Sequence, residues 1–360
     1  MMSAKRYAIG PMVGLPSTEW VGRDVAQYMQ TQNINVELFK HYESLLDVDV
    51  VYVIKVMPSV SWLQKQKARG SKLIYFPVDI FDHPWREIMY REHFKYFDAF
   101  CVHNTRTQPI FNVEDARLFF VNHHLKYESN RSVEQTSGQV LWIGHLEYVP
   151  SLIMYLAKLP KLAENGFCIL TDLEKYEFYR HQIQQELDEA GIDYSEEWEN
   201  EASLLLSGHR LTQWSEQEQA KQLQSCVGAI DTKLDKYGHN FKPPTKAQKY
   251  IFNAIPFACP STSYSSEYFH QIGFEVPDSS DIESLCSADY FAKVTEFAKA
   301  NRHMVEIDSV AKSYLYADSA STFRPKPGSV WLSNTRNAIN QIHVFVIRAV
   351  KKLAKIIKRK

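Results

Sequence analysis

Short apolar runs alternate with helix-like stretches along the first third of the chain. Six runs rich in β-branched and aromatic residues stand at 5–12, 35–39, 49–56, 72–79, 99–104 and 117–124. Residues 17–32 and 59–70 read as helices between them, and the second stretch ends in Gly70, a typical residue beyond a helix C-terminus. Strands that alternate with helices in this way predict βα units and a mostly parallel sheet.

The same alternation restarts after a polar, unpatterned segment at 129–138, which we interpret as a linker. Further strands are expected at 139–145, 167–172, 209–214, 227–231 and 256–260, with a helix that ends at Gly191. The sequence therefore predicts an α/β fold with two Rossmann-like domains, 1–128 and 139–318, that face a central cleft. Ligands of such sheets bind beyond the carboxyl ends of the strands, so residues that follow each strand are the informative ones.

Composition narrows the class of protein. Of the 360 residues, 45% are apolar and 13% aromatic, which supports large cores and argues against disorder. The five cysteines are scattered without C-x-x-C spacing, which fits reduced thiols and neither a disulfide framework nor a zinc site. The first residues lack a signal-peptide pattern, and no apolar run approaches the ~20 residues that span a bilayer. We therefore expect a cytoplasmic protein.

Two strand ends of the first domain carry candidate chemistry. Gly10 and Gly14 bracket the turn after the first strand and could bring backbone amides against a phosphate; an ordinary βα turn is the alternative. The fourth strand ends in VDIFDHPW, which places Asp79, Asp82 and His83 together. A carboxylate at this edge can take a proton from a hydroxyl nucleophile, so these three are the candidate catalytic residues. The structural alternative is a turn or a helix cap, because Asp-His-Pro is also good turn sequence.

No metal site is expected from the sequence. Asp47-Val48-Asp49 resembles a DxD metal signature, but it stands before its strand, at the amino edge and away from the expected cleft. The 13 histidines show no H-x-x-x-H or similar ligand spacing. We therefore expect chemistry that proceeds without a metal.

The stretch FKPPTKAQKYIFNAIPFACP, residues 241–260, concentrates candidate anion-binding groups. Pro243-Pro244-Thr245 can begin a helix, with Thr245 as its cap. Lys242 and Lys246 stand four residues apart at that helix start, and Lys233 lies in the loop before it. The positive end of a helix and several ammonium groups attract the same ligand, a diphosphate. In the first strand of the second domain, Gly144 lets a ligand approach the backbone.

This order of residues resembles the donor-binding region of GT-B glycosyltransferases of the family 1 and family 4 type. In that region, a helix of the form KPPxKxxEYxxxGxPV and a small-residue loop ending in Glu hold a nucleotide-sugar. The matching stretch here runs from Lys242 to Glu267. The resemblance implies a hexosyltransferase-type enzyme with a nucleotide-sugar as substrate and no bound cofactor. The donor-binding residues that we expect are Gly10, Gly14, Gly144, Lys233, Lys242, Thr245, Lys246, Tyr250 and Glu267.

The chain departs from the family pattern in three places. The run GHLEYVP lacks the Arg and Lys that many relatives carry after the glycine. Lys246 and its neighbours stand where an E-x7-E motif would begin, and Asn253-Ala254-Ile255 replaces the usual glycine before Pro256. A phosphate clamp would therefore depend on Lys242, Lys246 and Lys233.

Charge is segregated at the C-terminal end. Residues 319–360 hold ten Lys or Arg and no Asp or Glu, whereas the other 318 residues carry 31 basic groups (41 minus 10) and 42 acidic ones, a net charge of −11. Apolar residues of this tail recur largely at i, i+3, i+4 spacing, which is typical of an interfacial amphipathic helix. We expect residues 330–360 to bind an anionic membrane surface. The alternatives are nucleic acid, which is less favoured, and a helix packed on the protein itself.

Together these features predict a glycosyltransferase that moves a sugar from a nucleotide-sugar to a glycan or lipid-linked acceptor. It would act peripherally at a membrane, without metal, in polysaccharide biosynthesis. One alternative is a sugar-nucleotide epimerase of the same fold, which would need neither an acceptor nor a membrane tail. The other is a non-catalytic membrane- or nucleic-acid-binding protein that retains the cleft, and the missing Arg and Lys after Gly144 favour it.

Overall fold

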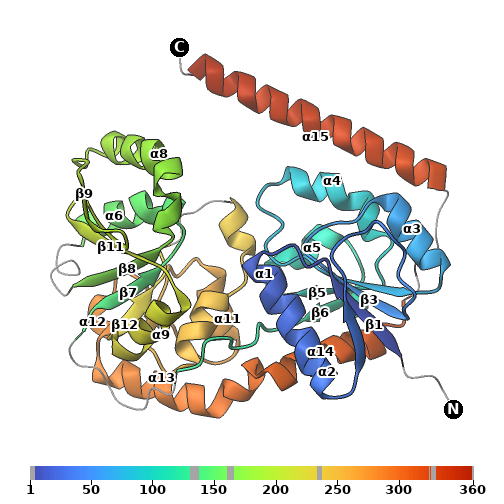
Figure 1. Cartoon of the computed structure of the whole chain (residues 1–360), viewed down its shortest axis with the longest axis horizontal. Coiled ribbons are helices and arrows are strands. Elements are labelled where there is room, and N and C mark those ends of the chain that lie inside the picture. The colour runs from blue at the N-terminus through green and yellow to red at the C-terminus, as the bar shows by residue number, and fades with distance from the viewer. Residues whose placement is uncertain are drawn as a thin grey trace. The chain divides into compact units, whose positions relative to one another are not determined.

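The computed structural model describes residues 5–129, 138–159, 166–232, 237–323, 325 and 330–358. The chain forms two compact units. The first combines residues 1–124 with two later segments, 236–243 and 304–360, and the second holds 125–235 and 244–303. Each unit is built on a sheet of its own (Figure 1).

A six-stranded sheet forms the centre of the first unit, in the order β2-β1-β3-β4-β5-β6. All its neighbouring strands are parallel. The strands are β1 (Arg6–Gly10), β2 (Asn35–Leu38), β3 (Val50–Ile54), β4 (Lys72–Phe76), β5 (Ala99–Val102) and β6 (Leu118–Phe120). The central strands β3 and β4 are buried along their whole length, as expected for a parallel sheet that is covered on both faces.

Helices cover both faces of this sheet and so create two apolar cores. On one face lie α2 (Asp24–Thr31) and α14 (Ile307–Ala320). On the other face lie α3 (Val60–Ala68), α4 (Trp85–Phe94) and α5 (Gln108–Phe111). The unit also contains the short turns α1 (Pro16–Thr18), η1 (Glu19–Arg23), η2 (Thr105–Thr107), η3 (Asp115–Arg117) and η6 (Tyr237–Phe241).

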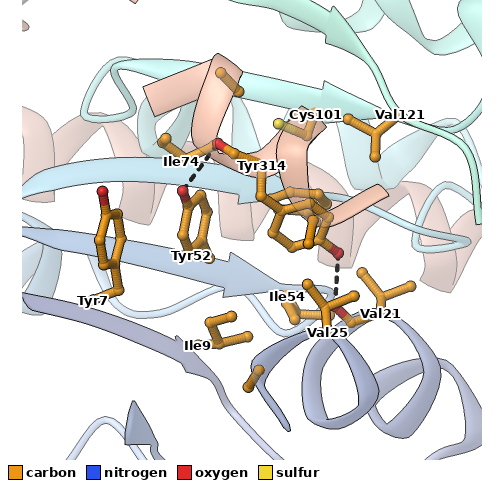
Figure 2. Close-up of a cluster of buried hydrophobic side chains, with 14 of the residues drawn as sticks. Tyr7, Ile9, Val21, Val25, Tyr52, Ile54, Ile74, Cys101, Val121 and Tyr314 are labelled. Carbon is orange, nitrogen blue, oxygen red and sulfur yellow. Dashed lines mark hydrogen bonds between the residues drawn. The ribbon is translucent and has the colours of Figure 1, made fainter. Parts of the chain in front are cut away.

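Helix α14 is fixed on the first sheet although it comes late in the chain. The Tyr314 carbonyl accepts a hydrogen bond from the Tyr52 hydroxyl at 2.9 Å, and the Tyr314 hydroxyl donates to the Val21 carbonyl at 2.6 Å. Figure 2 shows both bonds inside the apolar cluster. The sequence pattern had assigned residues up to 318 to the second domain, whereas in the structure the chain from Met304 onward packs with the first unit.

A seven-stranded sheet forms the second unit, in the order β13-β12-β7-β8-β11-β10-β9. Strand β10 is antiparallel to both of its neighbours, and the other pairs are parallel. The strands are β7 (Val140–Ile143), β8 (Phe167–Thr171), β9 (Glu196–Asn200), β10 (Ser203–Leu206), β11 (His209–Gln213), β12 (Gly228–Ile230) and β13 (Phe257–Ala258). Strands β9 and β10 were not predicted from the sequence, and EEWEN in β9 lacks the apolar residues that mark a strand.

The helices of the second unit alternate with these strands. They are α6 (Val149–Ala157), α8 (Tyr176–Glu189), α9 (Glu216–Ser225), α10 (Thr245–Ile251), α11 (Tyr264–Gln271), α12 (Ile282–Leu285) and α13 (Ala288–Asn301). The short turns are η4 (Leu146–Tyr148) and η5 (Leu173–Lys175), and η7 (Arg302–Val305) leads into the returning segment. The predicted α/β class with two sheets is confirmed, while most of the predicted linker, residues 130–137, lies outside the described residues.

The final helix α15 (Val330–Lys358) packs on α3 and α4. Its buried side includes Ser333, whose hydroxyl accepts from the Tyr96 hydroxyl at 2.8 Å, and Val344. The helix also exposes the apolar residues Ile339, Ile342, Phe345, Val346 and Val350. The helix therefore presents an apolar stripe to solvent. None of the helices in the described part of the chain is long and apolar enough to cross a bilayer.

Candidate functional site

The carboxyl edge of the first sheet holds an ion pair between the ends of two neighbouring strands. Lys55 follows β3 and Asp79 comes shortly after β4, and Lys55 Nζ lies 2.6 Å from Asp79 Oδ1. Lys55 Nζ also lies 3.3 Å from the Ser17 hydroxyl. The two charged side chains are 23% and 36% exposed, so a ligand can reach both.

Backbone strain accompanies this ion pair. Lys55 and Val78 have φ angles of 58° and 49°, a region that costs a non-glycine residue roughly 1–2 kcal/mol and that β-branched residues rarely adopt. Lys55 is held there because its N–H donates to the Phe76 carbonyl at 2.8 Å and its carbonyl accepts from the Tyr75 hydroxyl at 2.9 Å. Strain of this kind clusters at functional sites, which supports Asp79 as the main candidate on this edge.

Asp82 and His83 have local partners instead. Asp82 pairs with Arg86 at 2.7 Å, an i,i+4 pair at the start of α4, and the His83 ring stacks on Trp85 with the ring centres 5.9 Å apart. Both contacts are those of a helix start. Asp79 therefore differs from the other two predicted catalytic residues, because its partner Lys55 follows another strand and does not belong to the helix start.

The two glycines of the first loop serve different needs. A Cβ on Gly10 would lie 2.4 Å from the Phe39 carbonyl oxygen, so the close approach of two chain segments requires glycine there. Gly14 has a φ of 71° with open space around it, a backbone conformation that glycine adopts without strain. Gly10 is buried and Gly14 is exposed, so Gly14 is the one that a ligand can approach.

Two buried imidazoles follow the last strands of the first sheet. His103 follows β5 and His123 follows β6, and their ring centres are 4.1 Å apart. His103 Nδ1 donates to the Val121 carbonyl at 2.6 Å, and its Nε2 has no partner among the described residues. Burial lowers the pKa of His103 to about 4 and the pKa of His123 well below its usual value. Both rings are thus neutral at pH 7 and offer hydrogen bonds rather than charge.

The carboxyl edge of the second sheet carries a half-exposed lysine. Asp231 follows β12, and Lys246 lies in the first turn of α10 with its Nζ 3.2 Å from Asp231 Oδ1. The same Nζ lies 5.5 Å from the centre of the Trp142 ring. The Lys246 side chain is 32% exposed, whereas that of Asp231 is 5% exposed. A carboxylate and an aromatic ring therefore hold an ammonium that remains accessible to an anion.

Gly144 determines where Trp142 lies. A Cβ at position 144 would be 2.0 Å from Cη2 of Trp142, so only glycine leaves room for the indole. The Gly144 N–H donates to the Leu170 carbonyl at 3.1 Å and so belongs to the sheet. The space that the sequence analysis reserved for a ligand is thus filled by the indole, whose own buried N–H has no partner in the described part of the chain.

A second lysine lies behind the first. Lys249 is 7% exposed, and its Nζ donates to Gln219 Oε1 at 3.0 Å. Burial, together with the nearby charge of Lys246, lowers the pKa of Lys249 to about 7, although Asp231 opposes the shift. Two lysines and one aspartate therefore share this edge, and their excess of positive charge suits an anionic ligand.

Three more predicted donor-binding residues lie on helices of the second unit. Thr245 is the first residue of α10, but Pro244 is the N-cap residue and no side chain caps the helix, so the predicted cap does not form. Tyr250 is fully buried and stacks on Phe257 with the ring centres 5.3 Å apart. Glu267 lies in α11, where its carboxylate accepts from Gln271 Nε2 at 3.2 Å. Tyr250 is thus a core residue in this structure.

Two further lysines were predicted to bind the donor. Lys242 belongs to the first unit, where its carbonyl oxygen accepts from Asn104 Nδ2 at 2.9 Å. Lys233 lies outside the described residues. Within the described ranges, no group of three or more His, Cys, Asp or Glu side chains is arranged to hold a metal ion.

Four residues at the two carboxyl edges were not predicted as site residues: Trp142, Lys249, His103 and His123. Trp142 had a usable signal, because residues two apart in a strand share a face and Gly144 was already a candidate. Lys249 had none, since its partner Gln219 is 30 residues away in the chain. His103 and His123 had a weak signal, because both stand near the carboxyl end of an expected strand.

Comparisons with known proteins bear on the fold. No protein-family model matches the chain, and no curated protein has a matching sequence. Among solved structures, a glycosyltransferase from Rickettsia africae is similar with 9% identity and a TM-score of 0.57, over 89% of this chain and 100% of that one. AviGT4, a glycosyltransferase involved in avilamycin A biosynthesis, is similar with 10% identity and a TM-score of 0.55, over 90% and 100%.

TarM from S. aureus is also similar, with 11% identity and a TM-score of 0.51, over 81% of this chain. The chain spans 57% of the length of that TarM structure. At such identities the likeness shows the fold alone. The chain has the GT-B fold, as the resemblance of residues 242–267 had implied.

Proposed function

We propose that the protein is a glycosyltransferase that transfers a sugar from a nucleotide-sugar to an acceptor hydroxyl. The GT-B fold supports this proposal, and similar solved structures include glycosyltransferases. The observation that carries it is Lys246, which Asp231 and the Trp142 ring hold at the carboxyl edge of the second sheet. An accessible ammonium with a second lysine behind it favours a diphosphate over a neutral ligand.

In the proposed reaction, Lys246 binds the diphosphate of the donor. The bond between the anomeric carbon and the phosphate oxygen breaks, and the acceptor oxygen forms the new glycosidic bond. The nucleoside diphosphate leaves with the electrons of the broken bond, so negative charge grows where Lys246 stands. A fixed ammonium stabilises this charge more in the transition state than in the ground state, and we propose that the reaction needs no metal.

On the first sheet, Asp79 is the proposed acceptor-side group. Its carboxylate would accept the proton that the acceptor hydroxyl loses. Lys55 lies 2.6 Å away and would keep the carboxylate oriented. The neutral His103 and His123 rings on neighbouring strand ends add hydrogen-bonding capacity without charge, which suits a sugar or another hydroxyl-bearing acceptor.

The first experiment is a thermal-shift screen of the purified chain with UDP-, GDP- and ADP-sugars, with and without EDTA. A ligand at 100 times its Kd adds ~2.7 kcal/mol to stability, which is readily measured. We expect at least one nucleotide-sugar to stabilise the protein in EDTA. Stabilisation that requires added Mg²⁺ or Mn²⁺ would contradict the metal-independent mechanism, and no stabilisation by any nucleotide would contradict the donor site.

The second experiment separates chemistry from donor binding. Asp79→Asn keeps the size of the side chain but removes its ability to accept a proton. Transfer should fall by about 100-fold or more, in line with general-base contributions, while nucleotide affinity stays near that of the wild type. Wild-type turnover in Asp79→Asn would remove Asp79 from the mechanism.

We further propose that α15 binds the protein to an anionic membrane, where a glycan or lipid-linked acceptor would lie. The helix exposes Ile339, Ile342, Phe345, Val346 and Val350. Arg336, Lys351 and Lys352 are also exposed, and the tail holds no acid. Each basic residue near an anionic leaflet contributes ~1 kcal/mol, and exposed apolar side chains enter the interface.

Vesicle co-sedimentation tests this membrane proposal. Phe345→Ser should weaken binding to phosphatidylserine vesicles, because Phe345 is 72% exposed and would insert. Phe178→Ser is the matched control, since Phe178 is 82% exposed but lies in α8 of the second unit. Binding should also fall with salt, because screening acts within ~8 Å at physiological ionic strength. If the protein ignores these vesicles but binds DNA or RNA, the partner is a nucleic acid.

A further inference from the structure

Helix α15 runs antiparallel to α4 within the first unit and contacts it near both ends. Near the start of α15, the Ser333 hydroxyl accepts from Tyr96, which follows the end of α4. In its second half, the Arg348 guanidinium lies over the ring of Trp85, the first residue of α4, with Cζ 5.2 Å from the ring centre. The second half of α15 is thus held beside the segment that joins β4 to α4, which carries Asp79.

Trp85 contacts two guanidinium groups, of which only one has a carboxylate partner. Arg86 Cζ lies 4.9 Å from the centre of the indole, and its Nε donates to Asp82 at 2.7 Å. Arg348 is exposed and has neither a hydrogen bond nor an ion pair among the described residues. The indole therefore orients a planar guanidinium whose N–H donors have no acceptor in this part of the chain.

Two exposed lysines extend this positive charge along the helix. Lys351 and Lys352 follow Arg348 by three and four residues, so the three cations share one face of α15. Neither lysine has a partner within the described ranges, and residues 319–360 include no Asp or Glu. Three cations beside one aromatic ring favour a ligand that carries a phosphate.

The apolar stripe of α15 indicates that this phosphate belongs to a lipid. The stripe includes Val346 and Val350, and Arg348 lies two residues from each, on the other side of the helix. A helix with one apolar and one basic face lies in a bilayer interface, with lipid chains on one side and headgroups on the other. A free phosphate would not need the stripe, and a second copy of the chain would bring two basic tails together.

This corner of the first unit adjoins the proposed acceptor-side carboxylate. Asp79 precedes Trp85 by six residues, which span at most ~22 Å. Burial is the main cause that raises the pKa of Tyr75, and the charges of Arg86 and Asp79 act on that pKa in opposite directions. Both charged groups therefore lie near the Tyr75 ring.

We propose that the acceptor is a hydroxyl-bearing lipid with a phosphate in its headgroup, and that Arg348, held over Trp85, binds this phosphate. The headgroup hydroxyl would then be the group that faces Asp79. The inference rests on the proposed function and narrows the acceptor to one chemical class. It requires only residues of the first unit.

Calorimetric titration with dihexanoyl phosphatidylglycerol tests this site, because the lipid carries a phosphate and hydroxyls and stays monomeric below its critical micelle concentration. In the full-length protein, Arg348→Gln should weaken binding about tenfold or more, the effect of losing one charge-assisted contact. Arg91→Gln is the matched control, since Arg91 is exposed on α4 but no aromatic ring of the described residues holds it. Equal losses in both variants would reveal a diffuse effect of charge and would overturn the site.

Substitutions at Trp85 test the ring itself. Trp85→Leu removes the stacked indole and should weaken binding in the same direction as Arg348→Gln, by a smaller factor, whereas Trp85→Phe keeps a ring and should retain most of the affinity. Trp198→Leu is the control, because Trp198 is 43% exposed but lies on β9 of the second unit. Wild-type affinity in both Trp85→Leu and Arg348→Gln would overturn the role of this corner.

Two further ligands identify the source of the phosphate. Dihexanoyl phosphatidylcholine has the same chains but no net charge and should bind more weakly than phosphatidylglycerol. Inorganic phosphate lacks the chains and should compete poorly even in excess. Equal binding of the two lipids would exclude recognition of the phosphate charge, and inorganic phosphate that binds as tightly as the lipid would replace the lipid by a free anion.

Transfer kinetics test the acceptor assignment. With a nucleotide-sugar that stabilises the wild type, dihexanoyl phosphatidylglycerol should have a lower KM than phosphate-free dihexanoylglycerol, and Arg348→Gln should remove this difference with little change in kcat. If the wild type binds nucleotide-sugars and the phosphate does not lower KM, the acceptor assignment fails while the proposed function stands. If the lipid binds through Arg348 but no nucleotide binds, the proposed function fails, and the acceptor assignment fails with it.

Discussion

Two lysines and one aspartate meet at opposite kinds of edge in the two units. At the amino edge of the first sheet, Asp318 forms ion pairs with Lys5 at 2.8 Å and with Lys72 at 3.1 Å. At the carboxyl edge of the second sheet, Asp231 contacts Lys246 at 3.2 Å, while Lys249 has the neutral amide of Gln219 as its hydrogen-bond acceptor. In the first cluster the aspartate pairs with both lysines, whereas in the second cluster it pairs with Lys246 and the other lysine, Lys249, bonds to an amide.

This difference in partners distinguishes a cluster that stabilises the fold from one that can bind a ligand. Asp318 also accepts from the Tyr7 hydroxyl at 3.2 Å, and Lys72 donates to the Ser321 carbonyl at 2.9 Å. Burial alone would raise the pKa of Asp318, but the bonds from Lys5 and Lys72 outweigh it and hold the pKa below its usual range. This network ties the end of α14 to the sheet. The second cluster keeps one lysine accessible and one buried against the neutral amide of Gln219, and burying an ammonium in this way is costly unless an anion arrives.

Removing the carboxylate of the first cluster should give the largest effect. Asp318→Ala leaves the buried Lys72 ammonium without its counter-ion, and breaking such a pair costs about 3–5 kcal/mol. Urea denaturation should show this loss. Because the folded pKa of Asp318 is lowered, the advantage of the wild type should be full above the unfolded pKa of about 3.9 and should shrink as the pH falls below it.

Pyrophosphate affinity of folded Asp318→Ala should equal that of the wild type. Weaker binding would mean that the first cluster also shapes the donor site, and the contrast between the two clusters would fail.

Lys249→Met should act in the opposite direction and stabilise the protein. The folded pKa of Lys249 is about 7, below the unfolded value of about 10.4. Between these values the unfolded state binds more protons, so wild-type stability should rise with pH, and below about pH 7 the full penalty applies. The variant should therefore be more stable than the wild type by roughly 4 kcal/mol near pH 7.

This advantage should shrink as the pH approaches about 10. Denaturation curves of both proteins across this range check the difference. A variant that is less stable at every pH would show that the ammonium of Lys249 is satisfied after all.

How far the sequence predicts these clusters depends on how local their contacts are. Lys246 was identified because a helix start and a preceding strand end are both visible in the local pattern. Lys249 was not, since its hydrogen-bond partner Gln219 lies 30 residues away. The return of α14 to the first sheet was missed for the same reason, as Tyr314 and Asp318 contact residues that precede them by about 250 positions or more. Patterns along the chain predict helices, strands and strand ends. They do not predict which distant side chain is the hydrogen-bond or ion-pair partner of a polar group.

Lys246→Met tests the second cluster directly. Loss of the Lys246 ammonium should weaken UDP and pyrophosphate binding by roughly 10- to 100-fold. This is the range expected when one charge-assisted contact worth about 1.5–3 kcal/mol is removed. The stability loss should be smaller than for Asp318→Ala, because the Lys246 side chain is 32% exposed. Lys312→Met is the control, since Lys312 has an exposed i,i+4 partner in Asp308. Equal affinity in Lys246→Met and the wild type would move the phosphate site elsewhere.

The smallest effect is expected at Asp82, which sharpens the contrast between accessible and structural charges on the first sheet. Asp82 pairs with Arg86 within one helix turn, and its side chain is 51% exposed. Exposed pairs of this type contribute about 0.3–0.5 kcal/mol, so Asp82→Asn should change the denaturation midpoint very little.

Asp82→Asn should also retain transfer activity, whereas Asp79→Asn should lose it. The reason is that Asp79 pairs with Lys55 from a different strand end, while the partner of Asp82 lies at the start of the helix that follows it. The two variants should be assayed side by side with the same donor and acceptor. Loss of activity in Asp82→Asn with retained stability would reverse the assignment and place the proton acceptor at the start of α4.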